Sequence, residues 1–486
     1  MSLRFVYGRA GCGKTRFCLE EIKNRIERGC TGRLYLLVPE QYTFQAEKDL
    51  IDMLESGGIL KNEVLSFRRL AYKVFNETGG ITYPHIHPAG KSMILYRILD
   101  KMDKKFRYFK NSVEKPGFIS KLSELVKEFK HYNVTPERLD EICGKLDDNT
   151  SLKEKMTELR NIYIAFNNTV KERYRDADDD LTAAAERMKM SGQFIDSEIW
   201  IDGFTDFTPQ EYKIIEVLLT QAKRVTITLV CDDLNDQASE LDVFSPSKKV
   251  YRKVLNMAIK NNISYEPPVF LNPEPLYRFR DNPELGHLEN NLYAHPYKVY
   301  RKETENITLF SSVNIFAEIE AAAKDILRLC RERGFRFRDI AVVTRNLDEY
   351  QGLIEAVFND FGIPCFLDRK LDISNHPLAR LILSMLEIFT ENWSYEAVFR
   401  YLKSGLTGIE PERIDRLENY VLACGIRGNQ WTADEKWNMS PELFPDACDS
   451  EQGMFSLEEL NRTRMEIVKP LMEFRHKTKG RRTAEE

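Results

Sequence analysis

The octapeptide Gly8-Arg9-Ala10-Gly11-Cys12-Gly13-Lys14-Thr15, written GRAGCGKT, decides the fold of this 486-residue chain. It fits the pattern G-x-x-x-x-G-K-[ST], in which glycines let backbone N–H groups surround a row of phosphates. The lysine offers its charge to the outer phosphates, and the threonine hydroxyl can bind Mg²⁺. The pattern therefore predicts a binding site for ATP formed by this stretch, with Thr15 as one ligand of the magnesium ion.

The sequence around this stretch has the alternation of strand and helix that the pattern requires. Leu3–Tyr7 is a short apolar run typical of a buried strand, and Thr15–Arg28 has its apolar residues on one helical face. Leu34–Val38 supplies a second apolar strand. A strand, a helix and a parallel strand in this order would place bound phosphates at the N-terminus of the helix.

The composition is that of a globular protein with several domains. Of its residues 42% are hydrophobic and 30% are charged, the mean hydropathy is -0.44 and the formal net charge is -5. No apolar run approaches the roughly 20 residues of a membrane-spanning helix, and no signal-peptide pattern precedes the first strand. These observations predict a cytoplasmic protein without a membrane partner, in which any contact with DNA is a local groove rather than a broad basic surface.

The cysteines also favour a reducing compartment. The nine of them are scattered and include no C-x-x-C pair, and their number is odd. Such spacing predicts neither a disulfide framework nor a metal site.

The pattern of apolar residues divides the chain into sheet-forming and helical segments, as expected for an α/β fold with parallel sheets. Residues 1–85 and 191–235 together form the predicted first sheet domain, and 86–190 form a helical insertion in it. A polar, proline-containing stretch over 236–305 has weak periodicity and is interpreted as a connector with some local structure. Residues 306–375 are predicted to begin a second sheet domain, and 376–486 are predicted to be helical.

The second sheet domain is predicted from short alternating elements. Ile307–Phe310, Asp339–Val343 and Pro364–Leu367 are predicted strands. Phe316–Arg333 and Leu347–Phe361 are predicted helices between them.

Several segments resemble motifs of the superfamily 1, UvrD-type helicases. Glu63–Ala71 is similar to their Ib segment, Asp178–Leu181 to the sequence that precedes motif II, and Ile199–Gln210 to motif II itself. Asp339–Arg345, together with Phe361–Pro364, is similar to the opening of their second motor domain. The resemblance implies that the two sheet domains are RecA-like, named 1A and 2A. It also implies that the helical segments are 1B-like and 2B-like insertions, the second of them truncated.

Two further runs, Leu3–Gly11 and Leu37–Glu47, narrow the resemblance to the AddB or RexB family, the B subunits of bacterial AddAB helicase–nucleases. That family is more than twice as long as this chain. The resemblance therefore implies a fragment without the nuclease domain and without the four cysteines of a 4Fe-4S cluster, so none of the cysteines here is assigned to one. It also implies an AddA-type motor and nuclease subunit as the partner, the processing of double-strand DNA ends for recombinational repair, and a role in recognising the Chi signal.

The residues that drive such a motor are incomplete. An active motor has an aspartate that holds Mg²⁺, followed by a glutamate that positions the attacking water. Here Asp202 is followed by Gly203, so that Asp206 or Glu211 would have to supply the missing carboxylate. We expect Asp202 to join Thr15 as a magnesium ligand, the alternative being a solvated carboxylate at a strand end. ATP is then expected to bind and to be hydrolysed slowly or not at all, and no catalytic residue is assigned.

Phe44, Phe67 and Arg68 lie in segments where the helicases contact single-stranded DNA. An aromatic face suits base stacking and a guanidinium suits phosphate contact, so these three are the predicted DNA-binding residues. The alternative is that the rings belong to the hydrophobic core.

Three functions remain open at this point. The first is the N-terminal, helicase-like part of an AddB subunit, which binds DNA and ATP without driving the motor. The second is an active DNA-stimulated ATPase or helicase with a catalytic base from an unexpected position. The third is a non-catalytic scaffold that docks the motor subunit and has no affinity for nucleotides.

Overall fold

The computed structural model describes residues 1–54, 62–79, 83–102, 106–113, 115–147, 150–234, 242–368, 373–439 and 451–480. The chain forms two compact units, Met1–Leu309 and Phe310–Glu486, and each unit is described by itself.

The first unit is built on a parallel sheet. Its strands are β1 (Ser2–Gly8), β2 (Leu34–Leu37), β3 (Asn62–Leu65), β4 (Glu198–Ile201), β5 (Arg224–Val230), β6 (Ser264–Tyr265) and β7 (Val269–Phe270). Their order is β3-β2-β4-β5-β1-β6, and β7 also pairs with β1. Every pairing is parallel, so the carboxyl ends of the strands meet at one edge, where Gly8 of β1 lies beside Val230 of β5. This confirms the predicted α/β class and the predicted parallel sheet.

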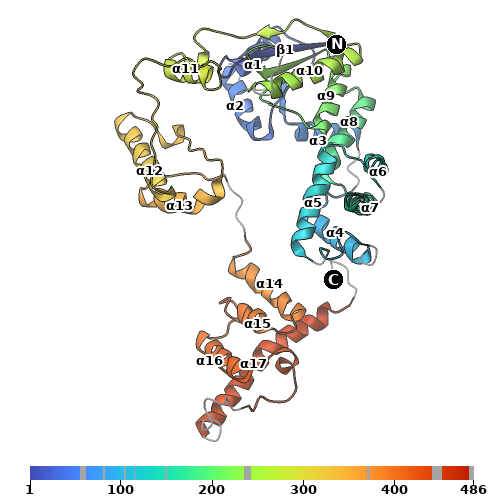
Figure 1. The fold of residues 1–486 in the computed structure, drawn as a ribbon, viewed down its shortest axis with the longest axis vertical. Helices are drawn as coiled ribbons and strands as arrows, with labels where there is room; N and C mark the ends of the chain where they lie inside the picture. Colours follow the sequence, from blue (N-terminus) through green and yellow to red (C-terminus); the bar gives the residue numbers. More distant parts are fainter. Residues whose placement is uncertain are drawn as a thin grey trace. The chain divides into compact units, whose positions relative to one another are not determined.

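Helices cover both faces of this sheet (Figure 1). One face carries α1 (Lys14–Glu27) and α2 (Thr43–Met53); the other carries α3 (Phe67–Thr78), α8 (Asp180–Ser191), α9 (Pro209–Gln221) and α10 (Ser245–Lys260). Successive residues of β2 pack alternately into the hydrophobic cores on the two faces of the sheet. Leu34 and Leu36 lie in the core on the α1 side, and Tyr35 and Leu37 lie in the core on the other side. Because both faces are buried, the strand has an unbroken apolar sequence rather than an alternating one.

The stretch predicted as a connector contributes to the sheet instead. Residues 245–270 supply α10, β6 and β7. The buried apolar residues of α10 are Val250, Val254 and Ala258, spaced four apart in one narrow row, while lysines and arginines occupy much of the rest of the helix. That single row and two strands of two residues each are too weak a periodic signal for a sequence pattern to detect.

The predicted helical insertion is mainly helical over its described residues, and Arg175 forms an isolated parallel bridge with His85. It contains α4 (Pro88–Met102), α5 (Pro116–His131), α6 (Pro136–Gly144) and α7 (Ser151–Arg173), which enclose a core of their own around Leu95, Ile162 and Phe166. The last helix of the predicted insertion, α8, differs. It packs Ala185 and Met188 into the core of the sheet, between α3 and α9.

The second unit begins with α12 (Ile315–Glu332) and α13 (Leu347–Asp360), as predicted, but the predicted strands around them are wrong for the described residues. Residues 307–310, 339–343 and 364–367 are not assigned to any strand. Leu309, Val343 and Phe366 are each at least 90% exposed. Their sequences suit a sheet, but no neighbouring strand within the described part of the unit offers the hydrogen bonds of a ladder.

The described residues of the rest of the second unit are mainly helical, as predicted. Its helices are α14 (Pro377–Thr390), α15 (Tyr395–Leu402), α16 (Pro411–Cys424) and α17 (Glu451–Thr478), packed around Trp393, Trp431 and Trp437. A search of the described helices finds none that is long and apolar enough to cross a membrane.

Candidate nucleotide site

The predicted phosphate loop connects β1 to α1 at the carboxyl edge of the sheet. Gly11 and Gly13 have φ angles of 81° and 93°, a region that residues with a Cβ rarely adopt. α1 begins at Lys14, so the unpaired N–H groups of its first turn face the loop. The sequence therefore folds locally into the strand, glycine turn and helix that can hold an anion.

Lys14 points back across this loop. Its Nζ donates hydrogen bonds to the carbonyl oxygens of Gly8 and Arg9, at 2.8 and 2.9 Å, and lies 3.6 Å from Cys12 Sγ. The ammonium charge is therefore held inside the curve of the loop, where the outer phosphates of a nucleotide would lie.

The two predicted magnesium ligands lie together. Asp202 follows β4 and is 2% exposed, and its Oδ2 accepts a hydrogen bond of 2.7 Å from Thr15 Oγ1. Its Oδ1 accepts a hydrogen bond of 2.5 Å from Thr228 Oγ1 on β5. The alternative of a solvated carboxylate is therefore wrong. A hydroxyl and a carboxylate oxygen are ligands that Mg²⁺ prefers, so the residues present fit the ion.

A cavity of about 870 Å³ opens in front of these groups. Its lining residues are Ala10, Gly11, Gly13, Lys14, Thr15, Arg16, Leu19, Tyr42, Asp49, Asp52, Met53, Asp202, Gly203, Phe204, Thr228, Val230, Tyr277 and Arg278. Tyr42 donates a hydrogen bond of 3.1 Å to Asp49 Oδ2. Burial and the neighbouring Asp49 carboxylate raise the pKa of Tyr42 to about 12, so this phenol stays protonated as a donor. The volume lies within the range of small-molecule sites.

Neither predicted replacement for the motor glutamate lies among the residues that line this cavity. Asp206 accepts hydrogen bonds from the Phe207 N–H at 2.7 Å and from the Tyr212 hydroxyl at 3.2 Å. Glu211 accepts the Thr208 N–H at 2.7 Å in the capping box of α9. Both carboxylates are thus engaged in holding the turn and the helix that follow β4.

Among the lining residues that the sequence analysis did not predict, Tyr277 and Arg278 come from the predicted connector. The short 3-10 turn η4 (Tyr277–Phe279) lies against the phosphate loop, and the Arg278 N–H donates to the Gly11 carbonyl at 3.1 Å. A Cβ on Gly13 would come within 2.8 Å of the Tyr277 ring. The only local sign of their role is the aromatic and basic run that begins at Tyr277. This run does not indicate that its partner is the phosphate loop, more than 260 positions earlier in the chain.

The three predicted DNA-binding residues do not share one environment. Phe44 is 75% exposed, and Arg68 is exposed with its guanidinium 5.9 Å from the centre of the Tyr72 ring. The predicted DNA contact of Phe67 is wrong, because its side chain is 4% exposed and packs against the rings of Phe204 and Phe207. Ser66 begins α3 as its N-cap, which turns the Phe67 ring inward to the core of the sheet domain.

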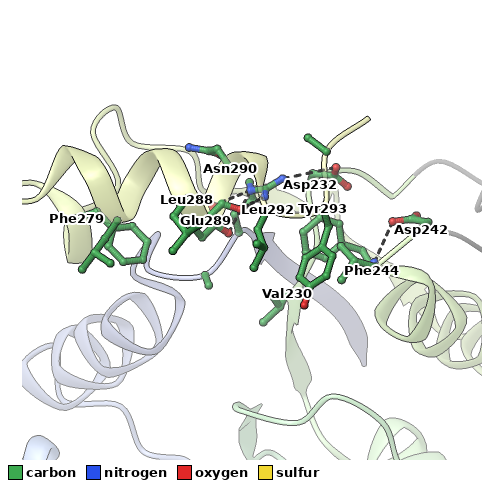
Figure 2. Close-up of a pocket in the computed structure, with 15 residues that line it drawn as sticks. Val230, Asp232, Asp242, Phe244, Phe279, Leu288, Glu289, Asn290, Leu292 and Tyr293 are labelled. Atoms are coloured by element: carbon green, nitrogen blue, oxygen red, sulfur yellow. Dashed lines mark hydrogen bonds and ion pairs between the residues drawn. The ribbon is translucent and has the colours of Figure 1, made fainter. Parts of the chain in front are cut away.

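A second cavity, of about 500 Å³, lies beside the phosphate loop (Figure 2). Apolar side chains line most of it, among them Val230, Phe244, Leu288 and Tyr293. They come from β5, from the segment before α10 and from α11 (Pro283–Asn291) with the residues after it. The loop residues Arg9 and Ala10 also line it, so the phosphate loop separates this cavity from the larger one.

The segment that resembles the sequence before motif II forms a buried ionic network. Lys130 of α5 is 2% exposed at its side chain and binds Asp176 and Asp179, at 2.7 and 2.6 Å. Lys91 of α4 binds Asp176 at 2.6 Å and Asp178 at 2.5 Å. Burial would raise the pKa of Asp178, but hydrogen bonds from His131 and Lys91 outweigh it and hold that pKa below its ordinary value. The network joins the helical insertion to the start of α8.

The phosphate loop after β1, the buried aspartate after β4 and the helical insertion between β3 and β4 define the class: this is a P-loop protein with a superfamily 1 helicase-like fold. Two family models match the chain, ADDB, N-terminal, over residues 5–289, and the UvrD-like helicase C-terminal domain over residues 283–477. The chain belongs to the ADDB family, the B subunits of helicase/deoxyribonucleases.

Individual relatives agree with the family models. The chain is 62% identical over 484 residues to the B subunit of the ATP-dependent helicase/deoxyribonuclease of Acetivibrio thermocellus and 51% identical over 486 residues to that of Ruminiclostridium cellulolyticum. The protein of the same name from Clostridium tetani is 44% identical over 487 residues. These alignments cover 99 to 100% of this chain, which spans 42% of the length of each of these relatives.

Proposed function

We propose that this chain is the nucleotide-binding and DNA-contacting part of the B subunit of an ATP-dependent helicase/deoxyribonuclease, and that it binds ATP with Mg²⁺ without turning it over efficiently. The observation that carries the proposal is the pairing of Thr15 with the buried Asp202, 2.7 Å apart, beside Gly203. Thr15 and Asp202, the proposed magnesium ligands, lie within hydrogen-bond distance of each other, and Gly203 has no carboxylate that could activate water.

Different residues of the chain would bind the phosphates, the magnesium ion and the rest of the nucleotide. The N–H groups of the loop and of the first turn of α1 would surround the phosphates, and Lys14 would neutralise the outer ones. Thr15 and Asp202 would hold Mg²⁺, which supplies charge neutralisation between the outer phosphates. Tyr277 and Arg278, which lie over the glycines of the loop, would contact the rest of the nucleotide.

The weak-motor part of the proposal rests on the neighbours of Gly203. Hydrolysis needs a group that positions the attacking water within hydrogen-bond reach of the outer phosphate. Asp206 and Glu211 are bonded to their own turn and helix cap, and neither lines the cavity. ATP would therefore serve this protein as a bound ligand that stabilises one conformation rather than as a fuel.

The wider activity is carried over from the family. The relatives are named as B subunits, which supports a heterodimer with an AddA-type motor and nuclease subunit in the cytoplasm. The complex would process double-strand DNA ends for repair and respond to Chi, and a nuclease centre and a 4Fe-4S cluster would lie outside this chain. Phe44 and Arg68, both exposed near the start of α2 and of α3, are the residues we propose for contact with single-stranded DNA.

Equilibrium binding of a fluorescent ATP analogue with Mg²⁺ tests the proposal. Saturable binding is expected for the chain and loss of binding for Lys14→Ala, while Lys23→Ala, on the same helix but paired with Glu27, should bind as the unaltered chain does. Absence of binding in all three would overturn the proposal in favour of a scaffold that docks the motor subunit. Rapid DNA-stimulated phosphate release that Lys14→Ala abolishes would instead favour an active ATPase.

A further inference from the structure

Arg9, inside the phosphate loop, is held by the last turn of α11. Its Nε donates to both carboxylate oxygens of Glu289, at 3.2 and 3.0 Å, and its Nη2 donates to the Glu289 carbonyl at 2.7 Å. The guanidinium also lies 5.1 Å from the centre of the Phe244 ring and 4.0 Å from Asp232. Figure 2 shows Glu289, Asp232 and Phe244 at the second cavity, with dashed lines for the hydrogen bonds and ion pairs at Glu289 and Asp232. Both side chains of the Arg9–Glu289 pair are at most 21% exposed, so water screens the pair only partly.

The first turn of the same helix holds another part of the chain. Glu284 is 7% exposed, and its two carboxylate oxygens accept the backbone N–H groups of Glu305 and Asn306, at 2.8 and 2.9 Å. Hydrogen bonds to a buried carboxylate are stronger than those between neutral groups. After it leaves α11, the chain is therefore bonded back to this helix at Glu305 and Asn306, a few residues before the second unit begins at Phe310.

The phosphate loop is bonded both to α11 and to η4, the 3-10 turn that precedes α11 in the chain. Besides the Arg9 contacts, the Arg278 N–H binds the Gly11 carbonyl, and a Cβ on Gly11 would come within 2.8 Å of Arg278 Cβ. Lys14 Nζ, the group expected to meet the phosphates, is bonded to the Arg9 carbonyl. A movement of the Lys14 side chain would therefore alter its hydrogen bond with the Arg9 carbonyl. The Arg9 guanidinium would in turn transmit this movement to Glu289 of α11.

From these contacts we infer that Glu289 is a positioning residue for the phosphate loop and that α11 couples nucleotide binding at the loop to the Glu305–Asn306 segment leading into the second unit. The inference rests on the proposed nucleotide site. Glu289 and η4 hold the loop in its cradle shape before a ligand arrives, which lowers the entropic cost of binding. Thermodynamic linkage makes this effect reciprocal. If the contacts that hold α11 raise the affinity for the nucleotide, then bound nucleotide stabilises α11 and the Glu305–Asn306 segment by the same free energy.

Hydrogen exchange at the Glu305 and Asn306 amides, with and without a saturating fluorescent ATP analogue and Mg²⁺, tests the coupling. In the unaltered chain the nucleotide should slow this exchange about fivefold or more, the lower end of common couplings. Glu289→Gln should weaken nucleotide binding by a similar factor and remove the slowing even at saturation. Glu284→Gln should speed the exchange with or without nucleotide, which verifies that the carboxylate protects these amides.

Controls keep the test decisive. Asp325→Asn, which removes an exposed pair with Arg328 in α12, should change neither binding nor exchange. If Glu289→Gln does not fold, Arg9→Lys replaces it, because a lysine cannot reproduce the forked contact with Glu289. Nucleotide binding that leaves the exchange at 305 and 306 unchanged would overturn the inference, as would Glu289→Gln with the response intact.

Failure of the nucleotide site itself has a different signature. If the unaltered chain binds no nucleotide, the proposed function has failed. Hydrogen exchange at Glu305 and Asn306 without ligand then tests whether the phosphate loop is linked to this segment through α11. Faster exchange at 305 and 306 in Glu289→Gln would then support the link from the loop through α11, and an unchanged rate would overturn it.

Discussion

By the resemblance to motif II, Gly203 takes the place of the glutamate of an active motor, and its backbone conformation is one that glycine favours. Its φ is 83°, and a Cβ there would lie 3.4 Å from Pro39 Cδ. A side chain in this left-handed region costs roughly 1–2 kcal/mol. Gly203→Glu should therefore lower the free energy of unfolding by about this amount and fail to create ATPase activity, because the backbone must leave its conformation to place the carboxylate.

Denaturant unfolding and phosphate release measure both parts of this prediction. Gly203→Ala is the matched control, since it introduces the same backbone strain without a carboxylate. A Gly203→Glu variant that is as stable as the unaltered chain, or that hydrolyses ATP rapidly, would show that the glycine is an accident of sequence rather than a requirement of the turn.

Thr228 illustrates how a residue of a neighbouring strand supports the site. Its hydroxyl is the partner of Asp202 Oδ1, and both residues are buried. Thr228→Val keeps the shape but leaves a buried carboxylate oxygen without a donor, which costs about 1–3 kcal/mol. We expect this loss in denaturant unfolding and expect Thr228→Ser to restore most of it; equal stability of the valine variant would mean that water replaces the hydroxyl.

At the scale of elements, the helical insertion is joined to the sheet domain by a buried ion pair. Lys130 of α5 and Asp176 have side chains that are 2% and 0% exposed. Removing one partner of a buried pair typically costs about 3–5 kcal/mol, because the other charge is left unpaired. Lys130→Met should destabilise the first unit in denaturant unfolding by less than this amount, because Asp176 keeps its ion pair of 2.6 Å with Lys91. Lys121→Met, on the exposed side of the same helix, should have little effect.

The same network predicts how the stability depends on acid. The pKa values of Asp176 and Asp178 lie below the ordinary value of 3.8, because the bonds from Lys130, Lys91 and His131 outweigh burial. Carboxylates whose folded pKa is lowered stabilise the fold above their unfolded pKa and lose this contribution as the pH falls below it. The contribution of Asp176 and Asp178 to the free energy of unfolding should therefore fall between about pH 5 and pH 2, by up to about 1.4 kcal/mol per pH unit for each, while Asp179, whose pKa is raised by burial, contributes with the opposite sign.

Denaturant unfolding across this pH range checks the prediction. Asp178→Asn should be less stable than the unaltered chain near neutral pH but should lose less stability on acidification. Glu124→Gln, which changes an exposed carboxylate on α5, serves as the control. Parallel pH profiles for Asp178→Asn and the unaltered chain would contradict the assigned role of Asp178.

At the scale of the whole molecule, the chain divides into two units with separate cores. Trp393, Trp431 and Trp437 lie in the second unit, and Trp200 is the fourth tryptophan of the chain. Tryptophan fluorescence therefore follows mainly the second unit, whereas circular dichroism follows both. We expect the two thermal transitions not to coincide, because separate cores unfold as separate cooperative units.

A nucleotide should then stabilise the first transition alone. At a concentration of one hundred times Kd the gain is about 2.7 kcal/mol for a ligand that binds only the folded form. The fluorescence transition of the second unit should stay in place, and Lys14→Ala should remove the shift. Transitions that coincide and move together would mean that the two units unfold as one.

Much of the site could be predicted from local sequence. The glycine spacing of the phosphate loop, the apolar strand before it and the amphipathic helix after it lie within about 30 neighbouring residues, and the structure forms them as predicted. Thr15 and Asp202 could be paired in advance because the phosphate-loop pattern and the resemblance to motif II assign both to the magnesium ion, and the structure brings them within 2.7 Å of each other.

Other features depend on segments that meet only in the folded chain. Phe67 looks like a DNA-stacking residue in its local sequence, and only the rings of Phe204 and Phe207 make it part of the core. The predicted strands 339–343 and 364–367 have suitable sequences, but a strand exists only where a neighbour completes its hydrogen bonds.

By itself, the sequence determined the phosphate loop, the α/β class and the family, because each depends on residue types at fixed short spacings. Only the tertiary structure decided that Asp206 and Glu211 are engaged elsewhere and that Tyr277 covers the loop. It also brought Glu289 to Arg9 across 280 positions of the chain. The physical reason is that burial, pairing and charge contacts are properties of surfaces that come together on folding, and the spacing of residues along a chain does not specify which surfaces those are.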